Sequence, residues 1–246
     1  MGAMHSVSET PRPAPGSLAH VLILLDYDGT ITTRECNEVI LQRFTGDAWR
    51  RLEDAVLAGN MSHAACFAQQ IGLVAAAHDE LVAAAVEAAE IAPGFDRFAR
   101  TLTAVGARLV VVSAGFREAI EAVWRRERLP AVQLIATEVM SAPDGGPPHR
   151  VAFDALLGDC PTCGPGGCKA GVLCALRRRQ DLVIVFGDGV SDLCMARAAD
   201  VVFARRHLAR LCASEGIACH PLDDYNTALE TILELTTPAV ANLPQR

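Results

Sequence analysis

The sequence predicts an α/β fold in which a mostly parallel sheet carries helices on both faces and an all-helical segment is inserted. Two observations predict this class. Short apolar runs such as Val21 to Leu25 and Leu182 to Phe186 each precede a polar turn and a helical pattern, as in chains of βαβ units. In addition, four helical patterns follow one another after the first run with no strand among them. We interpret this block as a cap inserted into an α/β core.

The first strand is predicted at Val21 to Leu25, and the inserted helices at 37–44, 49–58, 62–71 and 79–91. Ser62 and Asp79 are candidate N-caps, and Gly59-Asn60 and Pro93-Gly94 interrupt the helical periodicity. We therefore expect a helical cap domain over residues 35–94 and a Rossmann-like core formed by 18–34 and 95–246. The proline-rich segment 1–17 is predicted to be a disordered arm.

After residue 95 helices and strands alternate. Helices are predicted at 95–105, 116–128, 169–179, 191–198, 207–215 and 226–235. Strands are predicted at 108–112, 132–139, 182–186 and 201–203, with a short returning strand at 151–153. Because the strands are short apolar runs, we expect a sheet that is buried on both faces.

Composition narrows the classes of function. With 246 residues the chain can form one full core plus an insertion. Its formal charge of −7 argues against non-specific nucleic-acid binding. No apolar stretch reaches the ~18 residues of a membrane span, and no signal-peptide pattern is evident, so we expect a cytoplasmic protein. The odd total of nine cysteines argues against a full disulfide framework.

Two aspartates follow the first predicted strand directly. Asp26 and Asp28 lie two residues apart, before the turn residue Gly29. One carboxylate can attack phosphorus to give an aspartyl phosphate, and the other can protonate the leaving oxygen and later activate water. A polar turn without catalytic function is the alternative for this motif taken alone.

A second acidic turn follows the strand 182–186. Asp188 and Asp192, with Asp26, make an oxygen-rich site of the kind that Mg²⁺ prefers. Such an ion would let an anionic phosphate approach an anionic nucleophile. These residues also suit a helix N-terminus, and the two interpretations are compatible.

Two further positions can bind phosphate. Ser113 ends the strand 108–112, and its hydroxyl and the amides of Ala114 and Gly115 precede a helix. Lys169 opens another helix and would supply a positive charge to the phosphate and to Asp26. A simple N-cap and a solvated lysine are the alternatives.

These four pieces, in this order, resemble the haloacid dehalogenase superfamily of phosphohydrolases, and the resemblance covers nearly the whole chain after Leu18. It implies Asp26 as nucleophile and Asp28 as general acid and base. It implies that the phosphate is bound by Ser113, Ala114, Gly115, Lys169 and Gly29. Mg²⁺ would be held by Asp26, the backbone carbonyl of Asp28 and Asp188, with Asp192 in support. The helical insertion is similar to the cap of the phosphoserine phosphatase type.

Within that group the chain is similar to the methylthiopentenyl-phosphate phosphatase-like branch. The similarity rests on Asp26 to Thr32, on residues 49–53 and 58–59 in the cap, on Cys168-Lys169, and on the segments 187–204, 216–217 and 221–225. This branch also resembles phosphocholine and phosphoethanolamine phosphatases, so the resemblance leaves the substrate open.

Three residues are candidates for substrate specificity. Glu35 lies nine residues after Asp26, a spacing at which phosphoserine phosphatases place a glutamate that contacts the substrate amine. Arg50 and Arg51 could meet a carboxylate from the cap. A solvated hinge residue and solvated arginines are the alternatives.

The segment 160–168 holds three cysteines, Cys160, Cys163 and Cys168. They could bind Zn²⁺ with a fourth ligand such as His149. A Cys160–Cys163 disulfide and a plain loop are the alternatives.

Taken together, the sequence predicts an Mg²⁺-dependent phosphomonoesterase that acts on a small phosphorylated metabolite, as a monomer or homodimer, without nucleic acid or membrane. Two substrate classes stay open: a phosphoserine-type or phosphoamine substrate, and a methionine-salvage ketose phosphate. Three alternatives to hydrolysis are a phosphotransferase, a non-catalytic binding module on the same scaffold, and a metal or redox protein centred on the cysteines of 160–168.

Overall fold

A seven-stranded sheet forms the centre of the molecule. The computed structural model describes residues 17–237. The strand order is β4-β3-β2-β1-β7-β8-β9, and all neighbouring pairs are parallel except β3 and β4. The strands are β1 (Val21–Leu25), β2 (Arg108–Phe116), β3 (Gln133–Met140), β4 (Arg150–Ala152), β7 (Leu182–Gly187), β8 (Val201–Ala204) and β9 (His220–Pro221). The predicted mostly parallel α/β class is confirmed.

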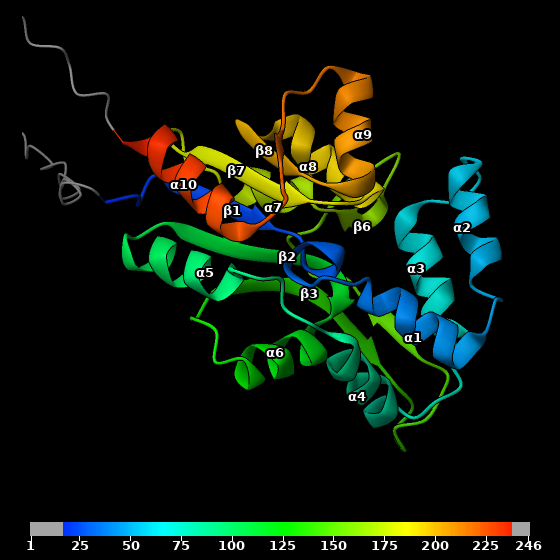
Figure 1. The fold of residues 1–246 in the computed structure, drawn as a ribbon. Coiled ribbons are helices and arrows are strands. Elements are labelled where there is room, and N and C mark those ends of the chain that lie inside the picture. Colours follow the sequence, from blue (N-terminus) through cyan, green and yellow to red (C-terminus); the bar gives the residue numbers. More distant parts are fainter. Residues whose placement is uncertain (1–16, 238–246) are drawn as a thin grey trace, which may run out of the picture.

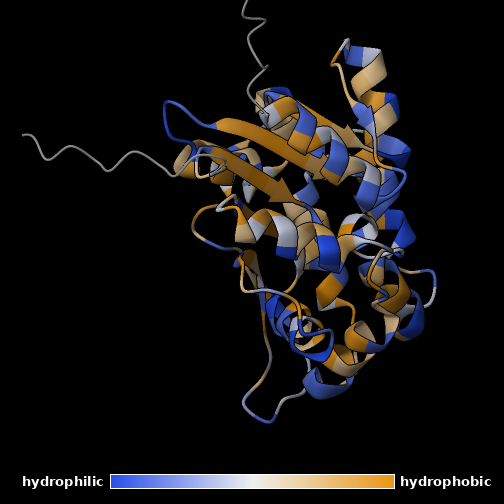
Figure 2. Cartoon of the chain, turned by 60° about the vertical axis from the view of Figure 1, so that its left-hand side comes forward, coloured by the Kyte–Doolittle hydropathy of each residue, from blue (hydrophilic) through white to orange (hydrophobic). Residues whose placement is uncertain are grey.

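Both faces of the sheet are buried. Along β1 the side chains alternate: Val21, Ile23 and Leu25 pack on one face, and Leu22 and Leu24 on the other. The first face contacts α5 (Phe95–Ala104), α6 (Arg117–Arg126) and α10 (Tyr225–Thr236). The second contacts α7 (Ala170–Leu176) and α8 (Leu193–Ala198), and α9 (Arg206–Glu215) packs beside α8. Figure 2 shows strands of the sheet as strongly hydrophobic segments between helices of mixed character, as expected of a sheet covered on both sides.

The four inserted helices pack around a small core of their own. They are α1 (Cys36–Thr45), α2 (Arg50–Leu57), α3 (His63–Gly72) and α4 (His78–Ala88). Trp49, Phe67 and Leu81 lie in this second core, which continues onto Phe116 at the end of β2. Figure 1 shows α1, α2 and α3 grouped at one end of the molecule. The insertion is therefore packed against the core through the strand end that carries Ser113.

The observed elements differ from the predicted ones in several places. The second strand continues through Ser113 to Phe116, and the helix after Lys169 ends at Leu176. Ser62 caps α3 by accepting a hydrogen bond from the Ala65 amide, whereas α4 begins one residue before the predicted cap Asp79.

Two strands in the cysteine segment were not predicted. β5 (Gly158–Cys160) and β6 (Gly164–Cys168) form a separate antiparallel hairpin, and the very short β9 was also missed. The hairpin lacks the apolar pattern by which a strand is predicted, because residues 158–168 are Gly, Asp, Cys, Pro and Thr. Strand β9 has only two residues, which is too short for any pattern. Apart from Ser17, the predicted arm 1–17 lies outside the described residues. Within 17–237 no helix is long and apolar enough to span a bilayer.

Candidate active site

The predicted site residues gather at the carboxyl ends of three adjacent strands. β1 lies between β2 and β7 and is parallel to both. Asp26 follows β1, Ser113 lies in the last part of β2, and Asp188 follows β7. In parallel α/β sheets this edge is where ligands bind. The topology thus explains how motifs far apart in sequence become neighbours.

The loop after β1 is tightly held. The Asp26 amide donates to the Phe186 carbonyl, and the Asp26 Oδ2 accepts a hydrogen bond of 3.0 Å from Thr30 Oγ1. Gly29 has a φ of +69°, which favours glycine. A β-carbon there would collide with the carboxylates of Glu35 and Asp188. Gly29 therefore lets the loop approach the acidic turn after β7.

Lys169 joins two of the motifs. Its ammonium is buried, forms an ion pair with Asp26 Oδ1, and lies 2.6 Å from Asp192 Oδ1. Although burial alone would lower it, the pKa of Lys169 is raised by these two carboxylates. The lysine is therefore charged, and a phosphate bound beside Asp26 would meet a positive charge.

Asp28 has a different environment from Asp26. Its carboxylate accepts hydrogen bonds from the Cys36 amide, 3.0 Å away, and from Asn37 Nδ2, 2.8 Å away. Burial raises the pKa of Asp28 to about 6, against the opposing effect of hydrogen bonds from the thiol and amide of Cys36. Gly115 allows close approach on the other side, since a β-carbon there would lie 2.9 Å from Asp28 Oδ2. Asp28 can therefore exchange a proton near neutral pH.

The acidic cluster has the donor set of a hard cation. Carboxylate oxygens of Asp26, Asp188 and Asp192 lie within 4.8 Å of one another, and all three residues are buried. Burial and the neighbouring Glu35 raise the pKa of Asp188 to about 8. Burial and Asp192 likewise raise the pKa of Asp26, against the effect of Lys169. Because the cluster holds more negative charge than Lys169 balances, these residues fit a divalent cation with oxygen ligands.

Asp192 mainly supports this cluster. Its Oδ2 accepts hydrogen bonds of 3.1 Å from the amides of Asp188 and Gly189. Since its Oδ1 pairs with Lys169, both oxygens already have partners. This geometry orders the turn that presents Asp188.

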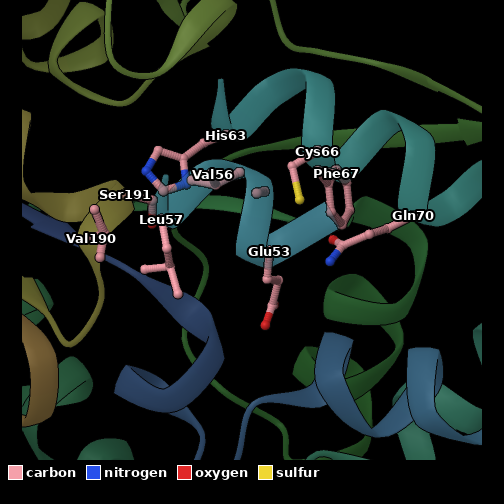
Figure 3. A pocket seen from close by; sticks show the side chains of 10 residues that line it. Glu53, Val56, Leu57, His63, Cys66, Phe67, Gln70, Val190 and Ser191 are labelled. Atoms are coloured by element: carbon pink, nitrogen blue, oxygen red, sulfur yellow. The ribbon is translucent and has the colours of Figure 1, made fainter. Parts of the chain in front are cut away.

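A cavity of about 320 Å³ lies between the inserted helices and the sheet edge. Figure 3 shows that its wall comes from α2 and α3 on one side and from the loop with Val190 and Ser191 on the other, with Glu53 extending into the space. Most of the lining is apolar, and the polar side chains are Glu53, His63, Gln70 and Ser191. A narrower recess that shares His63 and Ala114 with this cavity reaches Lys169. The cavity therefore connects to Ala114 and Lys169, two of the predicted phosphate-binding residues.

The candidate specificity residues are spread over two places. Glu35 lies at the site, 3.3 Å from Arg206 Nη1. Arg50 pairs with Asp47 at 3.1 Å and stacks over the Trp49 ring. Arg51 is exposed, and neither arginine lines the cavity. The helix that carries them instead turns Glu53, Val56 and Leu57 toward the space.

Two arginines at the site were not found from the sequence. Arg205 donates to the carbonyls of Gly29, Thr30 and Thr32. Arg206 has an unusual φ of +50° and places its guanidinium 3.2 Å from Asp188 Oδ2. Backbone strain of this kind tends to occur at functional sites. A pair of arginines after a short strand carries no signal of such contacts, because the partners lie in another segment.

The matches to known proteins agree with this geometry. A family model described as haloacid dehalogenase-like hydrolase matches residues 23–197. The chain belongs to this family. The matched range contains all four predicted motifs, from Asp26 to Asp192.

Several named proteins are similar to this member of the family. It is 29% identical over 237 residues to 2-hydroxy-3-keto-5-methylthiopentenyl-1-phosphate phosphatase of Bacillus velezensis, covering 91% of this chain and 98% of that protein. It is also 29% identical to the bifunctional enzyme MtnB/MtnX of Bacillus licheniformis, over 87% of this chain but only 49% of that enzyme. The chain thus spans about half of the bifunctional relative.

Solved structures show the same fold. A substrate-bound phosphoserine phosphatase complex matches with a TM-score of 0.66 and 19% identity, covering 86% of this chain and 97% of the other. A phospho-aspartyl intermediate analogue of phosphoserine phosphatase matches with a TM-score of 0.67 and 19% identity, covering 86% and 98%. The Rossmann-like haloacid dehalogenase core that the motifs predicted is confirmed.

Proposed function

We propose that this hydrolase is a phosphomonoesterase that works through an aspartyl phosphate on Asp26. The observation that carries this proposal is the contrast between two neighbouring carboxyl groups. Burial raises the pKa of both groups. Asp26 forms an ion pair with Lys169, which opposes that rise, whereas Asp28, with a pKa of about 6, accepts hydrogen bonds from neutral donors of α1. One is suited to attack phosphorus and the other to give and take a proton.

The reaction follows from these roles. Asp26 attacks phosphorus, the bond to the leaving oxygen breaks, and Asp28 gives that oxygen its proton. Asp28 then takes a proton from a water molecule, whose oxygen attacks phosphorus and releases Asp26 and inorganic phosphate. Lys169, Ser113 and the Ala114 amide would hold the phosphate oxygens through both steps. The Gly29 amide instead donates to the Arg34 carbonyl, and the Gly115 amide donates to Ser113 Oγ.

We propose Mg²⁺ as the cation of the acidic cluster. Asp26, Asp188 and the backbone carbonyl of Asp28 would bind it, and Asp192 would orient the Asp188 turn. The all-oxygen donor set supports magnesium over softer metals. When bound, the ion neutralises negative charge between the carboxylates and the phosphate. Since the pKa of Asp26 is raised without it, a cation there would also favour the ionised nucleophile.

We assign the helical block 35–94 the role of a cap that closes over the substrate and excludes water. The 320 Å³ cavity between α2, α3 and the core supports this assignment. Its lining includes Val56, Leu57, Cys66 and Phe67, which suit a substrate with an apolar tail. A ketose phosphate with a thioether tail, of the kind named for the Bacillus relatives, fits this lining.

An amine-bearing phosphomonoester is the second candidate. Glu35 and Glu53 provide carboxylates that could contact an ammonium group. However, the Glu35 carboxylate already has a cationic partner in Arg206. We therefore favour the ketose-type substrate. The net charge of −7 further supports a small-molecule substrate over a nucleic acid. We expect the enzyme to act in the cytoplasm as a monomer or homodimer.

The test is phosphate release from a panel of phosphomonoesters, with and without Mg²⁺. The panel contains p-nitrophenyl phosphate, phosphoserine, phosphocholine, phosphoethanolamine, sugar phosphates and a ketose 1-phosphate with a thioether tail. Magnesium-dependent release with preference for the ketose phosphate supports the proposal, whereas preference for an amine favours Glu35 as its ligand. Transfer to an added alcohol in place of water would indicate a phosphotransferase, and no release at all would favour a binding module.

A further inference from the structure

Four cysteine thiols meet beside the acidic cluster. The Sγ atoms of Cys160, Cys163, Cys168 and Cys194 all lie within 4.8 Å of one another. The first three belong to the β5–β6 hairpin, and Cys194 is the second residue of α8. None of them takes part in the proposed hydrolysis. This cluster therefore needs an explanation of its own.

The spacing of the sulfur atoms matches a tetrahedral metal site. Cys194 Sγ lies 3.9 Å from Cys160 Sγ and 3.8 Å from Cys163 Sγ. Four thiolates around zinc, with Zn–S bonds of about 2.3 Å, have sulfur atoms about 3.8 Å apart. A disulfide needs about 2.05 Å. All nine cysteines are free thiols, so the structure contains no Cys160–Cys163 disulfide.

The backbone of the hairpin is arranged to present these thiols. The Cys163 amide donates a hydrogen bond of 3.1 Å to Cys160 Sγ. Gly164, directly after it, has a φ of +86°, which lets the chain turn sharply between the two strands. Such a turn brings the thiols of a C-x₂-C pair to the same side, as zinc-binding loops require.

The hairpin has few apolar side chains of its own to hold it in place. Residues 158–168 contain only Gly, Asp, Cys, Pro and Thr, and two-stranded hairpins are marginally stable by themselves. Cys163 and Cys168 are nonetheless buried, and the Cys163 carbonyl accepts a hydrogen bond of 2.9 Å from the Ala64 amide at the start of α3. A segment without an apolar core of its own is the kind that metal binding stabilises.

His149, the candidate fourth ligand in the sequence, lies elsewhere. Both ring nitrogens of His149 have partners 2.8 Å away, Ser141 Oγ and the Ala76 carbonyl. His149 is not a member of the thiol cluster. Cys194 takes that place, and it comes from the turn-helix segment that also carries Asp188 and Asp192.

We propose that Cys160, Cys163, Cys168 and Cys194 bind one structural zinc ion that fastens the β5–β6 hairpin to α8. With four protein ligands the site is closed, so the ion has no open position for catalysis. It would fix two segments of the active site at once, because Lys169 follows Cys168 and Asp192 lies two residues before Cys194. It would also hold the loop on which α3 of the cap rests.

The test measures the metal content of the full-length protein after dialysis against buffer containing Mg²⁺. We expect one zinc per chain in the native protein and in the matched control Cys174→Ser, whose cysteine is exposed and lies outside the cluster. The double variant Cys160→Ser/Cys194→Ser should lose the zinc. A variant of the acidic cluster, Asp188→Asn, should keep it, which separates this ion from one bound at the hydrolytic site.

A second measurement covers the case in which the double variant fails to fold. Native protein loaded with Co²⁺ in place of zinc should show the intense visible absorption of tetrahedral thiolate coordination. In the zinc form, four more thiols should react with a thiol reagent after strong chelation than before it. Absence of zinc, zinc lost from Asp188→Asn but kept in the double variant, or a Cys160–Cys163 disulfide in the purified protein would each overturn the proposal.

Discussion

The acidic cluster and the thiol cluster lie next to each other, but we propose a catalytic role for the first and a structural role for the second. Both draw on the same two segments, since Cys168 adjoins Lys169 and Cys194 follows Asp192. The acidic cluster offers oxygen atoms, an ammonium group and access to a cavity, whereas the thiol cluster offers sulfur atoms alone. Ligand type decides which metal each prefers. The same two segments can therefore bind Mg²⁺ through oxygen atoms at one cluster and zinc through sulfur atoms at the other.

Of the changes that distinguish the two clusters, Asp26→Asn is expected to have the largest effect on activity. Asparagine keeps the shape of the side chain but removes the nucleophile, so phosphate release should fall to the background rate. The buried cluster loses one negative charge, and the thermal unfolding temperature should stay the same or rise. Steady-state kinetics and calorimetry on the same preparation measure both quantities.

The matching change in the thiol cluster is the Cys160→Ser/Cys194→Ser variant. It should lower the unfolding temperature more than Asp26→Asn does, while residual turnover stays above background. If Asp26→Asn retains near-normal turnover, the nucleophile has been assigned to the wrong residue.

A smaller effect is expected from Gly29→Ala. The new methyl group would meet the Asp188 and Glu35 carboxylates at a φ of +69°. Displacement of reacting groups by about 1 Å can cost roughly 10²-fold in rate, so kcat/KM should fall by about this factor. The zinc content should not change, because the atoms that the new methyl group would meet belong to Glu35, Asp188 and Arg206 and not to the four clustered cysteines.

Gly216→Ala is the control for the backbone cost in this experiment. Gly216 also has a φ of +69°, but nothing lies within 4 Å of a β-carbon there. Both variants should lose about 1–2 kcal/mol of stability from left-handed strain, while only Gly29→Ala loses activity. Equal losses of activity in the two variants would show that the contacts around Gly29 do not matter.

The last effect is a pH dependence of stability that arises at Asp188 and its neighbour Glu35. Burial raises the pKa of Asp188 to about 8 and that of Glu35 to about 7, from ordinary values of 3.8 and 4.5. Between these limits the folded chain binds more protons than the unfolded chain. Stability of the magnesium-free protein should therefore fall as pH rises from about 4 to about 8.

Added Mg²⁺ should reduce that slope, because the cation replaces the protons that the carboxylates hold. Thermal unfolding followed over this pH range, with and without Mg²⁺, measures the difference. A rise of stability with pH in the magnesium-free protein would contradict the arrangement of charges at Asp188 and Glu35.

The sequence predicted those strands, turns and helices whose signal lies within one short stretch of the chain, and the site motifs whose order along the chain matches a known family. Strand β1 and the turn after it could be predicted because five apolar residues lead directly into Asp26. The same holds for β7 and Asp188. The inserted helices were found from their periodicity, with boundaries that differ by a few residues from those observed.

The parts that escaped prediction depend on contacts between distant segments. Cys194 reads as an apolar residue of a helix until packing brings α8 against the β5–β6 hairpin. Arg206 has no partner in its own segment, and Glu53 turns toward a cavity that exists only once the cap is folded. In each case the residue type gives no local signal, because the role of the side chain depends on contacts that form only in the tertiary structure.

Arg205 has a consequence for the order in which the site can form. The carbonyl of Gly29 is held by a guanidinium 176 residues later in the chain. At synthesis rates of about 5–20 residues per second, the ribosome needs on the order of ten seconds or more to cover that distance. The catalytic loop and the cap thus emerge long before the side chain that fastens the loop. A nascent chain therefore completes its catalytic centre only after β8 and the start of α9 have emerged.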